Sequence, residues 1–190
     1  MPLHRIKSPI SEADIKSLRC GDEVLLTGTI FTARDAAHKR LIELIEKGED
    51  LPVDLKGQII YYVGPCPPRP GQAIGSAGPT TAYRMDPFTP AMLSYGVKGT
   101  IGKGPRRELV KEACSQYGAV YLAGIGGASA LLAMAVEKAE VVAYADLGTE
   151  AIRRLEVVDF PLIVAYDIYG GDVFQNEIPK YAGLDLPVCK

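Results

Sequence analysis

Three cationic side chains occur where a predicted strand gives way to a predicted helix. Arg34 follows the first long strand, Arg84 lies in the loop before a short helix, and Lys103 stands between two glycines before another helix. Guanidinium groups bind carboxylates through paired hydrogen bonds, and an ammonium adds a further positive charge. If these residues converge, they predict a site for a small anion with more than one negative charge, such as a dicarboxylate.

The loop around Arg84 also carries neutral groups suited to holding a polar substrate. Thr80 and Thr81 supply two adjacent hydroxyls in the run GPTTAYRMD (residues 78–86), which glycine and proline restrict. Donors and acceptors beside a fixed charge can orient a substrate. A capped turn with a surface arginine explains the same residues equally well, so both interpretations stay open at this point.

Other polar or glycine-rich positions are better explained by structure than by chemistry. Asp35 and His38 lie on the helix after Arg34, where a surface or helix-stabilising role is the simpler interpretation. The run GIGGAS (residues 124–129) resembles an incomplete dinucleotide-binding fingerprint, with Asp146 at about the right distance. Tight glycine turns also let a helix pack closely on a sheet, so packing or anion contact is favoured over nucleotide binding.

Hydrophobic periodicity indicates the elements that carry these residues. Strands are expected at residues 22–32, 56–63, 97–101, 119–124, 141–145, 152–158 and 162–166, and helices at 35–47, 87–95, 105–117 and 128–138. From residue 97 the order strand, helix, strand, helix, strand predicts parallel pairing. The carboxyl ends of parallel strands share one edge, where open α/β folds bind ligands, so the three cationic residues are expected to meet there.

Composition favours one folded α/β domain and excludes several classes of protein. The 190 residues are 47% hydrophobic and carry 21 basic against 23 acidic side chains, which excludes disorder and makes nucleic acid an unexpected partner. No apolar run reaches the roughly 20 residues of a membrane span, and residues 1–5 lack the apolar core of a signal peptide. We therefore expect a cytoplasmic protein of one domain, residues 1–190, in which residues 1–20 lead into the sheet and the tail from residue 170 is rich in turns.

The cysteines and histidines do not indicate a metal site. Cys20, Cys66, Cys114 and Cys189 form no CxxC pair, and His4 and His38 are the only histidines. A zinc site within the chain is therefore not expected.

Four motifs in order resemble the iron–sulfur (class I) fumarate hydratases. They are GPTTAYRMD (residues 78–86), IGKG (101–104), YLAGIGG (121–127) and EVVDFP (156–161). The resemblance is to the C-terminal domain of these enzymes, which is a separate β subunit in two-subunit members, and it covers about residues 21–174. The L-tartrate dehydratase β subunit is a close relative. The family fold for this half is the swivelling β/β/α domain, which is compatible with parallel βαβ units in the second half of the chain.

The resemblance also implies an activity and a set of roles. Family members dehydrate a 2-hydroxy dicarboxylate, such as malate to fumarate, with a [4Fe–4S] cluster held by cysteines of the other domain or α subunit and not of this chain. By motif position Arg34, Arg84 and Lys103 match contacts to the substrate carboxylates, and Thr80 matches the proposed proton-abstracting group, assisted by a carboxylate of the partner.

The expected function is therefore that of a β subunit active only in a hetero-oligomer with a fumarate hydratase α subunit. Malate and fumarate are expected to be better substrates than tartrate, although the bulky Tyr83 could supply a partner for the second hydroxyl of tartrate. Two alternatives stay open: an L-tartrate dehydratase β subunit, and a non-catalytic anion- or nucleotide-binding α/β module. A neighbouring gene for an iron–sulfur α subunit would favour an enzyme over the module.

Overall fold

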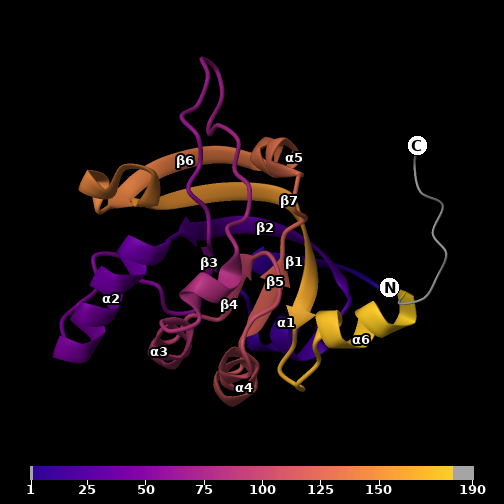
Figure 1. Ribbon diagram of the computed structural model, residues 1–190. Helices are drawn as coiled ribbons and strands as arrows, with labels where there is room; N and C mark the ends of the chain where they lie inside the picture. The colour runs from indigo at the N-terminus through magenta and orange to yellow at the C-terminus, as the bar shows by residue number, and fades with distance from the viewer. Residues whose placement is uncertain (1, 182–190) are drawn as a thin grey trace.

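The computed structural model describes residues 2–181 and places helices around a mixed β-sheet (Figure 1). The strands are β1 (Leu3–Ser8), β2 (Glu23–Thr32), β3 (Ile59–Tyr61), β4 (Gly99–Gly102), β5 (Val120–Ala123), β6 (Val136–Ala143) and β7 (Ile152–Tyr166). The α-helices are α1 (Glu12–Ser17), α2 (Asp35–Lys47), α3 (Thr89–Tyr95), α4 (Glu108–Tyr117), α5 (Ser129–Met134) and α6 (Val173–Tyr181), with 3₁₀ turns η1 (Ala82–Met85) and η2 (Ala145–Glu150). Within the described residues, no helix has the length and hydropathy needed to span a membrane.

The seven strands follow the order β1-β2-β3-β4-β5-β7-β6, with a further pairing between β2 and β7. From β1 to β5 each strand is parallel to its neighbour, whereas β7 is antiparallel to β2, β5 and β6. The β2–β7 pairing joins two strands that are also linked through β3, β4 and β5, so these five strands form a closed ring of hydrogen-bonded neighbours. The carboxyl ends of the parallel strands β2 to β5 consequently lie together at one edge of the ring.

The parallel units are more extensive than the sequence predicted. The expected strand–helix–strand unit at β4, α4 and β5 is confirmed, but parallel pairing already begins at β1 rather than in the second half. Residues 1–20, expected only to lead into the domain, include β1, which pairs along its whole length with β2. The swivelling β/β/α type of the fold stays a prediction.

The helix predicted over residues 128–138 is wrong in its second half. Helix α5 ends at Met134, and β6 begins at Val136 and pairs with β7 in antiparallel fashion. Pairing with a neighbouring strand decides the conformation of this segment, because tertiary contacts override the weak helical preference of its residues. The expected third parallel strand is therefore an antiparallel edge strand.

The C-terminal third also differs from expectation. The two strands predicted on either side of residues 159–161 are one strand of 15 residues, β7. Asp159 has a φ of 46°, and its N–H donates to Thr27 Oγ1 at 3.1 Å, so the chain accommodates an irregularity without leaving the sheet. The tail from residue 170, expected to be rich in turns, contains helix α6.

The helix predicted over residues 35–47 is confirmed as α2. It ends where Gly48 adopts a left-handed φ of 69°, a conformation that favours glycine. The helix therefore starts directly after Arg34 and positions that residue at its N-terminus.

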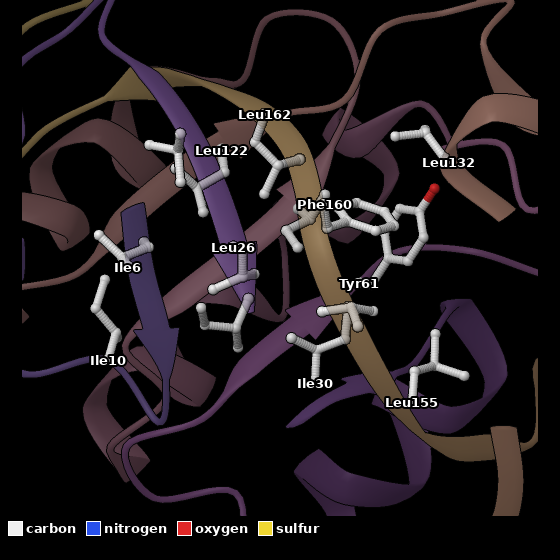
Figure 2. Packing of buried hydrophobic residues seen from close by; sticks show 14 of the residues in the cluster. Ile6, Ile10, Leu26, Ile30, Tyr61, Leu122, Leu132, Leu155, Phe160 and Leu162 are labelled. Carbon is white, nitrogen blue, oxygen red and sulfur yellow. The ribbon is translucent and has the colours of Figure 1, made fainter. Parts of the chain in front are cut away.

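Alternating strand residues divide the hydrophobic core in two. The first cluster packs between the five strands of the closed ring (Figure 2). In this cluster the aromatic side chains of Tyr61 and Phe160 lie edge to face beside Leu26, with 5.4 Å between their ring centroids. The second cluster lies on the other face of the strands, where Leu41 of α2 and Met92 of α3 pack. The strand ends are therefore held between two packed layers, which fixes the backbone that carries the predicted site.

Candidate active site

Arg34 stands where β2 gives way to α2. Its carbonyl accepts the backbone N–H of His38 at 2.8 Å, the first hydrogen bond of the helix. Its guanidinium passes closely over the backbone beyond β3, because a Cβ placed on Gly64 would lie 2.6 Å from Nη1. The absence of a side chain at Gly64 is thus what leaves room for the Arg34 side chain.

Asp35 connects the two predicted arginines. Arg84 Nη2 lies 3.0 Å from Asp35 Oδ1, and Arg34 Nη2 lies 3.7 Å from Asp35 Oδ2. One carboxylate between two guanidinium groups offsets the repulsion of their charges. Asp35 therefore has a larger role than the surface or helix-stabilising one that the sequence suggested.

Glu150 is a second acidic neighbour of Arg34, and no pattern in the sequence indicated it. Its Oε1 lies 3.4 Å from Arg34 Nη2, while its Oε2 accepts the N–H of Ala36 at 2.8 Å. Because Glu150 belongs to η2 and lies more than a hundred residues from Arg34 in sequence, no local pattern connects the two.

The predicted loop around Thr80 is attached to the ends of two strands. Thr80 donates its N–H to the carbonyl of Tyr62 at 2.7 Å, and its carbonyl accepts the N–H of Lys103 at 3.1 Å. Thr81 and Lys103 form an isolated parallel bridge. A Cβ on Gly102 would lie 2.7 Å from the Cβ of Ala82, so glycine permits this close approach. Thr80, Thr81 and Lys103 are thus brought together at the carboxyl edge, beside the loop that carries Arg84.

The hydroxyls of Thr80 and Thr81 and the ammonium of Lys103 are available to a ligand. Across residues 2–181, the side chains of Thr80 and Thr81 make no hydrogen bond and the exposed Lys103 makes no ion pair. No group of the described chain is therefore placed to accept the Thr80 proton.

His38 lies on α2 and is fully buried, so of its two predicted roles, surface or helix-stabilising, the surface role is wrong. The imidazole stacks on the ring of Phe88, with 5.8 Å between the ring centroids, and contacts the ring of Tyr62 edge to face, with 5.4 Å between the centroids. Burial lowers its pKa from 6.5 to about 4, so the ring is neutral at pH 7. Because a carbonyl only accepts, we assign the proton to Nδ1, which lies 2.9 Å from the Arg34 carbonyl. His38 thereby supports the backbone of Arg34.

A buried ion pair ties the Arg84 loop to the Lys103 loop. Arg106 Nε donates to Asp86 Oδ1, and both side chains are fully buried. Asp86 Oδ2 also accepts the N–H of Arg107 at 2.8 Å. Asp86 follows Arg84 by two positions and Arg106 follows Lys103 by three, so the pair fixes the spacing of the two loops. The sequence did not distinguish this arginine from a solvated one.

The described cysteines do not fit an iron–sulfur cluster, which needs several thiolates around one point. Cys20 is partly buried after α1, Cys66 is exposed in a loop, and Cys114 is buried in α4. In residues 2–181, no group of three or more His, Cys, Asp or Glu side chains could hold a metal ion. Cys189 lies outside the described residues.

The chain is similar to known proteins over most of its length. Residues 3–177 match the family described as Fumarase C-terminus. The chain is 40% identical over 181 residues to fumarate hydratase class I, anaerobic, of Escherichia coli strain K12, covering 94% of this chain and 32% of that protein. It is 45% identical over 153 residues to fumarate hydratase 1, mitochondrial, of Leishmania major, covering 80% of this chain and 28% of that protein.

A further relative is of similar size to this chain. Over 173 residues the chain is 39% identical to a Methanocaldococcus jannaschii protein provisionally named L(+)-tartrate dehydratase subunit beta, covering 88% of this chain and 89% of that protein. The chain thus spans about a third of the fumarate hydratases above and most of this subunit.

Proposed function

The chain belongs to the Fumarase C-terminus family, and from this premise we propose that it is the β subunit of a two-subunit hydro-lyase that interconverts malate and fumarate. The observation that carries the proposal is the placement of three cationic residues at the carboxyl edge of the parallel strands: Arg34 follows β2, Lys103 follows β4, and Arg84 lies in the segment that is bridged to Lys103 through Thr81. One of the relatives described above is named fumarate hydratase class I, and fumarate is a dicarboxylate.

The cationic residues are suited to holding two carboxylates. The Arg84 side chain is 44% exposed. Within the described residues it has one carboxylate partner, Asp35, which it contacts through Nη2. Its other N–H groups are available for a paired grip on a substrate carboxylate. Lys103 forms no ion pair with any residue from 2 to 181, so its ammonium can hold the second carboxylate. Asp35 and Glu150 restrict Arg34, so binding requires little loss of side-chain entropy there.

Thr80 is proposed to receive the proton removed from the carbon next to a carboxylate. An unperturbed hydroxyl is a weak base and needs a neighbour to take its own proton. No such neighbour belongs to the described chain, so a carboxylate of the partner subunit is proposed to serve. Thr81 is proposed to orient the substrate through its hydroxyl.

The [4Fe–4S] cluster implied by the resemblance is proposed to belong to the α subunit. The described cysteines lie on separate elements and do not fit it. This chain then supplies the cationic clamp and the proton-transferring hydroxyl.

A second candidate function is L-tartrate dehydration, because the relative of matching size carries that name. Tartrate has one more hydroxyl than malate. A pocket without a partner for that hydroxyl would discriminate against tartrate by about 1 to 3 kcal/mol. The phenol of Tyr83, which is 53% exposed and follows Thr81 in the same segment as Arg84, could provide one.

The test is anaerobic co-expression with the α subunit from the same organism, followed by assays on malate, fumarate and tartrate. The complex is expected to convert malate and fumarate, and the chain alone to be colourless and inactive. Turnover or bound cluster in the chain alone would refute the subunit assignment. A kcat/KM for tartrate that equals or exceeds that for malate would replace the first candidate by the second.

A further inference from the structure

An apolar surface adjoins the cationic edge. We call it the α5 surface and define it by Ile125, Leu131 and Met134, which are 53%, 55% and 82% exposed. In the six-residue helix α5, Leu132 faces the first core cluster, whereas Leu131 and Met134 face outward. The surface begins beside the predicted substrate site, because a Cβ on Gly126 would lie 3.9 Å from Lys103 Cδ.

A projecting arm borders the α5 surface. The arm comprises residues 66–76 and rises beyond the sheet next to α5 and β6 (Figure 1). Two backbone hydrogen bonds close its base, from Cys66 N–H to Ser76 at 3.0 Å and from Gly75 N–H to Cys66 at 3.2 Å. At its tip Gly71 has a φ of 82°, as a tight Pro-Gly turn requires. These two hydrogen bonds and the turn hold the arm in shape.

A hollow of about 770 Å³ separates the arm from α5 and β6. Ile74 lines it from the arm, and Ala133 and Met134 line it from α5. Arg69 and Glu137 provide polar groups in the same lining. Apolar and charged residues therefore line the hollow together, as they do in protein–protein interfaces.

The length of the relatives indicates what covers this surface. The chain spans about a third of each fumarate hydratase above, yet most of a protein named as a subunit. The region that matches this chain therefore occurs in two arrangements: as part of a longer polypeptide in the fumarate hydratases, and as a separate subunit in the Methanocaldococcus jannaschii protein. In both arrangements it must meet the remaining part of the enzyme, and an apolar surface contiguous with the site is where that contact would also close the site.

We propose that the α subunit of the enzyme binds the α5 surface and inserts into the hollow beside the arm. This inference rests on the proposed function, because it takes its partner from there. Docking at α5 would bring the α subunit next to Lys103 and Thr80, so that the partner can exclude water from the substrate. The arm then acts as a lateral wall that fixes the orientation of the two subunits.

The test is the affinity of the full chain for the α subunit under anaerobic conditions. A double variant, Leu131→Glu with Met134→Glu, places two charges on the α5 surface. The matched control is Leu109→Glu, because Leu109 is 38% exposed on α4, which lies at the opposite end of the molecule from α5 (Figure 1). Circular dichroism and Tm check that all variants fold.

We expect the double variant to bind the α subunit at least thirtyfold more weakly than wild type, as loss of an interface hot spot does. Leu109→Glu should bind within twofold of wild type. Hydrogen exchange on the wild-type chain is a second measurement that needs no variant. Addition of the α subunit should protect residues 66–76 and 125–134.

The outcomes separate this inference from the proposed function. If an active complex forms but the double variant binds normally, or protection falls elsewhere, the docking surface is wrong and the function stands. If the double variant abolishes assembly but the wild-type complex dehydrates neither malate nor tartrate, the function is wrong and the docking surface stands. A wild-type chain that does not bind the α subunit refutes the inference.

Discussion

Replacement of Gly64 by alanine tests how Arg34 is positioned without touching the arginine itself. The added Cβ would lie 2.6 Å from Arg34 Nη1, whereas ordinary contacts begin at 3.4 Å. The guanidinium must therefore move by about 0.8 Å. Gly64 does not have a positive φ, so alanine is compatible with its backbone.

A displacement of this size should reduce activity and leave the fold intact. Misplacement of a substrate-holding group by about 1 Å costs on the order of a hundredfold, which corresponds to about 2.7 kcal/mol of transition-state stabilisation. The obstructed atom is the end of a flexible side chain rather than backbone, so the Tm should change little.

A double-mutant cycle measures whether the effect passes through Arg34. We expect Gly64→Ala to lower kcat/KM for malate about a hundredfold in the wild-type complex and to have little further effect in Arg34→Ala. The control Gly126→Ala should be tolerated, because its nearest neighbour would lie 3.9 Å away. Normal kinetics in Gly64→Ala, or an equally large loss in the Arg34→Ala background, would refute this account of Arg34.

Three further predictions concern the clamp, the proton transfer and the buried histidine. Arg84→Lys should lower kcat/KM by about a hundredfold in the assembled enzyme, because an ammonium does not reproduce a paired grip; near-normal kinetics would show that Arg84 does not hold a carboxylate. Thr80→Val should reduce kcat far more than it raises KM, and it should slow solvent-deuterium exchange at C3 of malate; exchange at the wild-type rate would exclude Thr80 as the base. Burial lowers the pKa of His38 from 6.5 to about 4, so the unfolded chain binds the extra proton first as the pH falls. The free energy of unfolding should then decrease by up to about 3 kcal/mol between pH 7 and pH 4. Urea denaturation measured at several pH values should show a smaller decrease in the free energy of unfolding for His38→Gln than for the wild type. An equal decrease in the variant would contradict the burial of a neutral imidazole.

Local patterns predicted the elements that local residues determine. Helix α2 could be located because apolar spacing and Gly48 define it without any distant contact. The placement of Arg34 and Lys103 at one edge also follows from short-range order, since parallel strands align their carboxyl ends. Motif resemblance added roles, and those roles stay predictions.

Distant contacts determine the features that the sequence did not reveal. Residues 136–138 resemble the end of a helix, and only their pairing with β7 makes them the start of β6. His38 and Arg106 look like solvated residues on helix faces, and their burial depends on aromatic rings from other elements. Glu150 approaches Arg34 from a turn far along the chain. Single-sequence reasoning has no access to such contacts, because no local spacing encodes them.

The ring closure described above sets an order of events during synthesis. β2 lies near the N-terminus and pairs with β7 near the C-terminus, with Glu23 opposite Ile163. A nascent chain can pair β1 to β5 in turn, but the second edge of β2 remains open until β7 has left the ribosome. An open strand edge is a template for association with other chains. Chains that end before residue 152 should therefore aggregate rather than fold, and chaperone demand should be greatest until residues 152–166 have been made.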